Sequence, residues 1–146
     1  MRDELIAFLI RAKKSTYAAN GPYSASSRPG SRDLRYGEGG YEYIDSYLGG
    51  DRFAGQEAVW QNGAAVWAMN YAGRTLDPGF SGDFLKAALT QVTGERPFRG
   101  PEEHTDGVFT YKCAVKGDFE WFYGYEEIFK GDTKVYECAF HGGLIE

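Results

Sequence analysis

Apolar residues recur at helical intervals in two segments of the chain, which are therefore predicted to be helices. The first segment is residues 3–14, and its last residues, Lys13 and Lys14, suit the carboxyl end of a helix dipole. The second segment is residues 83–92, and it follows Ser81, whose hydroxyl can cap a helix N-terminus. Each predicted helix has one apolar side, so we expect both to pack against another layer of the protein.

Between and after these segments, apolar and polar residues alternate with the period of two that is typical of half-buried strands. Three strands are predicted after each helix, at residues 41–48, 53–60 and 64–72 and again at 107–116, 119–129 and 134–141. The dipeptide Asn62-Gly63 favours a tight type I′ hairpin turn between two of them. The sequence therefore predicts an α+β domain with the order αβββ-αβββ, a curved antiparallel sheet and two helices packed on one face.

The two groups of strands resemble each other at a constant offset of 69 residues. This offset places EEIFKGDTKVYECAFHG (126–142) over EAVWQNGAAVWAMNYAG (57–73) and aligns Glu126 with Glu57. Aromatic alternation alone makes unrelated strand pairs look alike, so the pattern leaves a pseudo-two-fold duplication open.

The hairpin around Asn62-Gly63 predicts which side chains share a face of the sheet. If these two residues form the whole loop, Val59 pairs with Val66. The face expected to lie under the helices then carries Ala54, Gln56, Ala58, Trp60, Ala65, Trp67, Met69 and Tyr71. The other face is shallow, with Glu57 and Asn70 as its polar groups, and the second half adds Glu126, Glu137 and His141 to it. A hollow face of small residues beside aromatic rings suits a small molecule.

Glu57 and Glu126 are thus predicted to form a carboxylate pair in a groove with an aromatic rim, where a cationic or amine ligand would find charge and ring faces. The candidate ligand-binding residues are Glu57, Glu126, Asn70, Tyr43, Tyr47, Trp121, Tyr123, His141 and Arg28. Two alternatives stay open at this point. The glutamates can act as acid or base if burial raises their pKa values, or they can be solvated or edge-strand charges that block aggregation.

Arg28 belongs to SSRPGSRDL, residues 26–34, within a long connection rich in Gly, Ser and Pro. Long loops are often functional, and an arginine beside serines can bind an anion. The alternative is a structural loop whose serines fix the turn and whose arginine pairs with an acidic neighbour. The motifs YID (43–45) and RGPEE (99–103) are equally ambiguous.

Composition narrows the class of protein. A chain of 146 residues fits one domain over residues 1–146, and its net charge of −5 argues against a surface that binds nucleic acid. No apolar run approaches the ~18 residues of a membrane span, and the N-terminal segment lacks the features of a signal peptide, so a cytoplasmic location is expected. Cys113 and Cys138 lack the spacing of metal ligands, and no familiar cofactor motif occurs, so we expect no metal and no cofactor.

Several motifs in a fixed order resemble a bacterial family known only as a domain of unknown function: SSRPGSRDLRY, FAGQEAVW, DFEWFYGYEEI and VYECAFHGGLI. Members of that family occur alone or behind a Cro/repressor-type helix-turn-helix in predicted transcription regulators. Because no helix-turn-helix is evident here, the resemblance implies a ligand-sensing module rather than a DNA-binding domain. Duplicated effector-binding domains of the GyrI-like kind are more loosely similar, although no strand is evident before the first helix.

The sequence therefore predicts a non-enzymatic, effector-binding protein for a small cationic or amine ligand, without direct contact to nucleic acid or membrane. The alternatives are a small hydrolase or isomerase that uses Glu57 or Glu126, and an interaction module that forms a homodimer through its aromatic surface.

Overall fold

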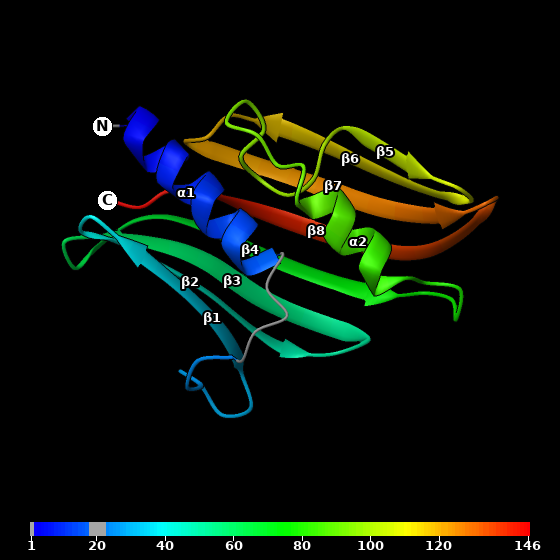
Figure 1. The fold of residues 1–146 in the computed structure, drawn as a ribbon, viewed down its shortest axis with the longest axis horizontal. Helices are drawn as coiled ribbons and strands as arrows, with labels where there is room; N and C mark the ends of the chain where they lie inside the picture. Colours follow the sequence, from blue (N-terminus) through cyan, green and yellow to red (C-terminus); the bar gives the residue numbers. More distant parts are fainter. Residues whose placement is uncertain (1, 18–22) are drawn as a thin grey trace.

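The computed structural model describes residues 2–17 and 23–146. Within these residues, the strands form one antiparallel sheet of eight strands, in the order β1-β2-β3-β4-β8-β7-β6-β5. Both helices lie on the same face of this sheet (Figure 1). The elements are α1 (Arg2–Tyr17), β1 (Arg32–Glu38), β2 (Tyr41–Gly49), β3 (Arg52–Gln61), β4 (Ala64–Thr75), α2 (Gly82–Leu89), β5 (Glu103–Asp106), β6 (Phe109–Gly117), β7 (Trp121–Lys130) and β8 (Thr133–Leu144).

The predicted α+β class, the antiparallel sheet and the two helices are confirmed, but each half of the chain contributes four strands rather than three. The additional strands, β1 and β5, are the two edges of the sheet. Their sequences, RDLRYGE and EHTD, are polar and short. An edge strand exposes unpaired backbone groups on one side, and short, polar edges limit pairing with other chains. The sequence predicts only a short strand around residues 34–36, within β1, and apolar alternation in EHTD is too weak to predict β5.

A β-bulge corrects the predicted faces of the hairpin. Gln61 pairs with Ala64 as expected, but the register shifts between Trp60 and Val59, so Val59 lies opposite Trp67 instead of Val66. Val66 is the extra residue in β4, and every pair farther from the turn is therefore shifted by one position relative to the prediction. As a result, Glu57 shares a face with Trp67 and not with Asn70. The second half has its own bulge between Ile128 and Phe129.

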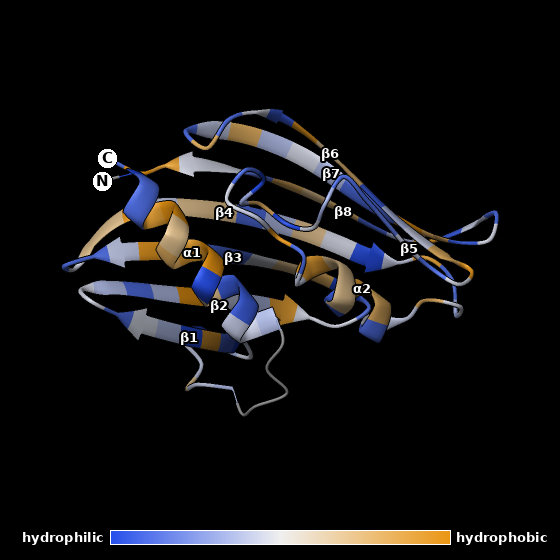
Figure 2. Ribbon diagram, turned by 45° about the horizontal axis from the view of Figure 1, so that its top comes forward, coloured by the Kyte–Doolittle hydropathy of each residue, from blue (hydrophilic) through white to orange (hydrophobic). Residues whose placement is uncertain are grey.

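The two faces of the sheet differ in what packs on them. The covered face, on which α1 and α2 lie, carries Glu57 and Glu126 together with most of the apolar core. Apolar positions alternate with polar ones along the helices and the strands (Figure 2). The core side chains from α1 and α2 are Leu5, Phe8, Leu9, Ala12, Phe84, Ala88 and Leu89. Full burial of each large apolar side chain contributes about 1.5–3 kcal/mol, which holds both helices against the sheet.

The uncovered face is the opposite side of the sheet and carries Gln56, Asn70 and His141. Its edge at β1 and β2 is overlaid by the 24–31 segment, whose backbone and hydroxyl groups bond to Asp33 and Ser46. Among the described residues, no helix has the length and apolar character needed to cross a membrane.

Candidate functional site

Glu57 lies in the middle of β3, and its side chain is fully buried beneath α1. Lys13 Nζ donates to Glu57 Oε1 over 2.8 Å, and the hydroxyl of Tyr43 donates to the same oxygen over 2.5 Å. The hydroxyl of Tyr17 donates to Glu57 Oε2 over 2.9 Å. Lys13 also donates to the carbonyl oxygen of Phe98 over 2.6 Å. Both carboxylate oxygens are therefore occupied by donors from the chain itself.

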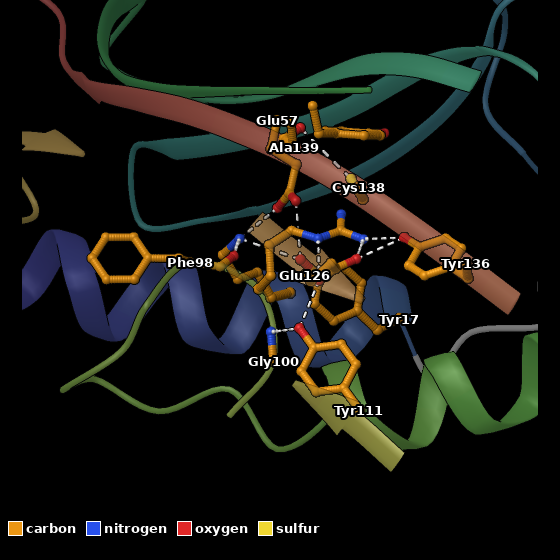
Figure 3. A network of polar contacts seen from close by, with 12 residues as sticks. Tyr17, Glu57, Phe98, Gly100, Tyr111, Glu126, Tyr136, Cys138 and Ala139 are labelled. Carbon is orange, nitrogen blue, oxygen red and sulfur yellow. Dashed lines mark hydrogen bonds and ion pairs between the residues drawn. The ribbon is translucent and has the colours of Figure 1, made fainter. Parts of the chain in front are cut away.

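Glu126 occupies the equivalent position in β7 and is also fully buried. Arg99 donates two parallel hydrogen bonds to this carboxylate, from Nε to Oε1 over 3.1 Å and from Nη2 to Oε2 over 2.7 Å. Tyr111 and Tyr136 donate to Oε1 and Oε2, each over 2.6 Å (Figure 3). Burial by itself raises the pKa of Glu126, but the Arg99 charge and these donors outweigh burial and hold the pKa below its ordinary value.

The two networks are joined through the segment that contains Phe98 and Arg99. Phe98 accepts from Lys13 in the first network, and the next residue, Arg99, binds Glu126 in the second. The Arg99 guanidinium also lies 5.2 Å from the centre of the Tyr71 ring. The Tyr71 hydroxyl in turn donates to Asp45 Oδ1 over 2.5 Å. A continuous band of polar side chains thus crosses the layer between the helices and the sheet.

Asp45 is a third buried carboxyl group in this band, directly opposite Glu57 in the pairing of β2 with β3. Burial and, next, the negative charge of Glu57 raise the pKa of Asp45 to about 7. Like charges at directly opposed positions repel each other, so a proton on Asp45 relieves this pair.

This buried band joins α1 and the segment after α2 to the sheet through two ion pairs. Each glutamate is neutralised by a cation from outside the sheet, Lys13 from α1 or Arg99 from the segment after α2. The cost of desolvating a buried ion pair offsets much of its attraction, but removal of one partner leaves an uncompensated buried charge and is strongly destabilising. The glutamates therefore fix α1 and the 98–100 segment on the covered face, which is not the open groove that the sequence predicted for them.

The uncovered face holds a groove of about 520 Å³ over β2, β3 and β4. Its lining combines small residues with the aromatic Trp60. The groove is lined by Ser27, Arg28, Ile44, Ser46, Leu48, Ala54, Gly55, Gln56, Ala58, Trp60 and Asn70. Ligand sites of small molecules have this size and combine an apolar lining with a few polar groups.

Asp33 organises the 24–31 segment and so places Arg28 at this groove. The hydroxyls of Ser31 and Ser46 each donate to Asp33 Oδ1 over 2.8 Å, and the backbone N–H of Ser27 donates to Oδ2 over 3.1 Å. Burial raises the pKa of Asp33, but these donors outweigh it and keep the pKa below its ordinary value. The serines thus fix the turn, as one of the two sequence alternatives proposed.

Arg28 reaches from this turn to Ser46, where Nη2 donates to the hydroxyl over 3.1 Å and to the carbonyl oxygen over 3.3 Å. Within residues 2–17 and 23–146, no ion pair joins Arg28 to a carboxylate. The guanidinium of Arg28 therefore lies at the rim of the groove and is linked to the Asp33 carboxylate through the Ser46 hydroxyl.

A row of polar side chains continues from the groove across the uncovered face. Gln56 Nε2 donates to Asn70 Oδ1 over 2.9 Å. Asn70 lies opposite His141 on β8, and His141 lies opposite Tyr123 on β7. Trp121 follows on the same side of β7. Of the predicted site residues, this face brings together Arg28, Asn70, Trp121, Tyr123 and His141.

The remaining predicted site residues lie on the covered face. Tyr43 is fully buried against Glu57, while Tyr47 is half-buried near the sheet edge, with its hydroxyl 2.7 Å from that of Tyr23. The predicted single groove is thus divided between two faces, because the bulge in the hairpin reverses the face of β3 relative to β4.

Sequence reasoning missed the residues that neutralise the two glutamates. Lys13 and Tyr17 continue the four-residue spacing from Leu5 and Leu9, so helical periodicity alone predicts that they point toward the core. Arg99 lies in an irregular segment, where no periodicity indicates its direction.

Most of the chain matches the model of a known protein family. A family model described as "Domain of unknown function (DUF5680)" matches residues 45–145, from within β2 to the end of β8. Neither the curated proteins nor the solved structures contain a match to the chain. The predicted resemblance to a domain of unknown function is confirmed, whereas the link to helix-turn-helix regulators stays a prediction. Because the match includes both glutamates and the central strands of the sheet, the chain belongs to the DUF5680 family.

Proposed function

We propose that this protein binds a small anionic molecule in the groove on the uncovered face and acts as a non-enzymatic effector-binding module. The observation that carries the proposal is the position of Arg28, a guanidinium without a carboxylate partner among the described residues, at the rim of a groove of about 520 Å³.

The chemistry of the groove suits a ligand with one anionic end and an apolar or planar body. A guanidinium presents a fork of donors that matches a carboxylate or phosphate. The amides of Gln56 and Asn70 and the hydroxyl of Ser46 supply further hydrogen bonds. The half-buried ring of Trp60 and the alanines of the lining give apolar contact along the body of the ligand.

The proposed charge of the ligand differs from the cationic or amine ligand that the sequence predicts. That prediction depends on Glu57 and Glu126 facing a groove, whereas Lys13 and Arg99 already neutralise both within the covered layer. Binding without catalysis is favoured because the described lining includes neither a histidine nor a carboxylate to act as a general base.

An internal duplication is a further part of the proposal. The bounds of β3 and β7, and those of β4 and β8, differ by the same 69 residues. The two bulges also fall at corresponding places, after Val59 and after Ile128. A shared ancestral unit of one helix and four strands would account for this agreement.

Arg28→Gln is expected to weaken ligand binding tenfold or more, because a hydrogen bond to a charged group contributes about 1.5–3 kcal/mol. The measurement is a thermal-shift screen of small carboxylates and phosphates against the wild-type protein, followed by titration of the hits with the variant. A ligand at 100 times its Kd stabilises the folded state by about 2.7 kcal/mol, so a hit gives a clear rise in Tm.

Arg11→Gln is the matched control, since it removes an exposed guanidinium from α1 on the other side of the sheet. We expect it to leave the affinity for every hit unchanged. The proposal fails if anions produce no shift, if amines are the only hits, or if both variants bind the hits as the wild type does.

A further inference from the structure

Three aromatic side chains form a stripe along the uncovered face of β7. Trp121, Tyr123 and Tyr125 occupy alternate positions, which places them on the same side of the strand about 7 Å apart along it. They are unusually exposed for aromatic residues, with 77%, 54% and 37% of their surface accessible. We call these three residues the aromatic stripe.

The ring faces of the stripe are not used by other aromatic rings of the described chain. Ring pairs involve Trp67, Phe122 and other core residues, but none includes a member of the stripe. Large rings left in water carry an unfavourable hydration free energy that stacking on a ligand would remove.

Contacts within the protein fix the Tyr125 side chain before any ligand binds. Its hydroxyl donates to Glu137 Oε1 over 2.6 Å, and Lys134 Nζ lies 4.9 Å from the centre of its ring. The hydrogen bonds from Tyr125, Arg74 and Lys134 lower the pKa of Glu137 to about 2, so this carboxylate stays charged. A ring fixed in this way loses little conformational entropy when a ligand stacks on it.

Two hollows flank Tyr125 and are rich in hydrogen-bonding groups. One measures about 750 Å³ and is lined by Glu102, Glu103, Lys112, Cys113, Ala114, Tyr125 and Glu127. The other measures about 380 Å³ and is lined by Arg52, Phe53, Ala72, Gly73, Arg74, Tyr125, Glu137 and Ala139. The first hollow is mainly acidic and the second mainly basic, so both signs of charge are present beside Tyr125.

We propose that the aromatic stripe is a binding surface for a neutral oligosaccharide, separate from the anion groove over β2, β3 and β4. Sugar rings have apolar faces that stack on Trp121 and Tyr123, while their hydroxyls donate to carboxylates and accept from lysines and arginines in the two hollows. An extended ligand of linked rings fits a row of exposed aromatic side chains on an open sheet better than a compact one does.

The charged side chains beside the stripe favour an oligosaccharide over two other classes of ligand, a protein and a single-stranded nucleic acid. The cores of protein–protein interfaces are depleted of charged residues, whereas Glu127, Lys134 and Glu137 lie beside the Tyr125 end of the stripe. Single-stranded nucleic acid also stacks on aromatic rings, but it requires a positive groove along its phosphates. The mixed charge here and the net charge of −5 do not provide one.

The test is a titration of the full chain with cellohexaose, chitohexaose and maltohexaose, followed by calorimetry and by tryptophan fluorescence, to which the exposed Trp121 contributes. We expect at least one hexasaccharide to bind with a Kd in the micromolar to millimolar range. Trp121→Ala and Tyr123→Ala should each weaken that binding tenfold or more. Val108→Ala, which truncates an exposed apolar residue in the β5–β6 turn, should leave it unchanged.

Circular dichroism of each variant separates loss of binding from loss of folding. Arg28→Gln should not affect hexasaccharide binding, so the failure of one proposed site is distinguishable from the failure of the other. The inference is overturned if none of the three sugars binds at millimolar concentration or if both alanine variants bind like the wild type. It is also overturned if the stripe instead binds a dodecathymidylate, or if light scattering shows a dimer that Trp121→Ala dissociates.

Discussion

Glu126→Gln is expected to lower the free energy of unfolding by about 3–5 kcal/mol, because it leaves the guanidinium of Arg99 buried without a countercharge. The amide keeps the size of the carboxylate, and its carbonyl oxygen can still accept from Tyr111 or Tyr136. Its NH2 group cannot accept from the donors of the other oxygen, so the expected loss includes that acceptor as well as the charge. Chemical denaturation followed by tryptophan fluorescence measures the loss. The m-value should stay constant, since the surface exposed on unfolding does not change.

The matched control is Glu42→Gln, which breaks the exposed pair between Glu42 on β2 and Arg35 on β1. Exposed pairs contribute about 1 kcal/mol or less, so this variant should remain near wild-type stability. The double variant Arg99→Met with Glu126→Gln should recover part of the loss, because it removes the uncompensated charge. Equal losses in the two glutamine variants would mean that Glu126 is not paired in the folded protein.

The sequence predicts the elements of this fold better than the sides on which they face. Period-two and helical patterns find both helices and the six inner strands, because burial on one side leaves a regular spacing of apolar residues. The extra residue of a bulge leaves no such trace. Val66 continues the apolar run of β4 whether or not it is the bulged residue, so the face of Glu57 was predicted wrongly.

The sequence predicts the site residues on regular strands better than those in irregular segments. Asn70, Tyr123 and His141 lie on regular strands, and their alternation indicates the uncovered face. Arg28 is placed by side-chain hydrogen bonds to Asp33 from residues of two separate segments, and sequence spacing does not encode such a cluster. The partner of Glu126, Arg99, lies 27 residues before it in an irregular segment.

The two faces differ in how closely the halves of the chain agree. On the covered face, residues separated by 69 positions keep their type, as for Phe53 with Phe122, Gly55 with Gly124, Glu57 with Glu126 and Val59 with Ile128. On the uncovered face they do not, as for Ala54 with Tyr123, Gln56 with Tyr125, Ala58 with Glu127 and Ala72 with His141. The matching positions thus lie on the covered face, and the uncovered face carries the two different surfaces for which we propose ligands.

Asp45→Asn is expected to stabilise the protein by about 2–4 kcal/mol at pH 8 and by a smaller amount, about 1–2 kcal/mol, at pH 5, which lies just over one unit above the unfolded pKa of 3.8. Burial, aided by the negative charge of Glu57, raises the pKa of Asp45 from 3.8 to about 7 in the folded state. The folded protein therefore holds more protons than the unfolded chain between about pH 4 and pH 7, and stability falls as the pH rises through this window. The difference in pKa corresponds to about 4 kcal/mol, which is the full cost of ionising Asp45 above pH 7.

The asparagine avoids this cost because its side chain stays neutral, while its carbonyl oxygen can still accept the hydrogen bond from Tyr71 that Asp45 Oδ1 accepts in the wild type. Urea unfolding of both proteins at pH 5 and pH 8 measures the change. Asp132→Asn in the exposed β7–β8 turn is the control and should move stability by less than about 0.5 kcal/mol at either pH. If Asp45→Asn shifts stability equally at both pH values, Asp45 is already ionised in the folded protein, and the proton that relieves its repulsion with Glu57 is absent.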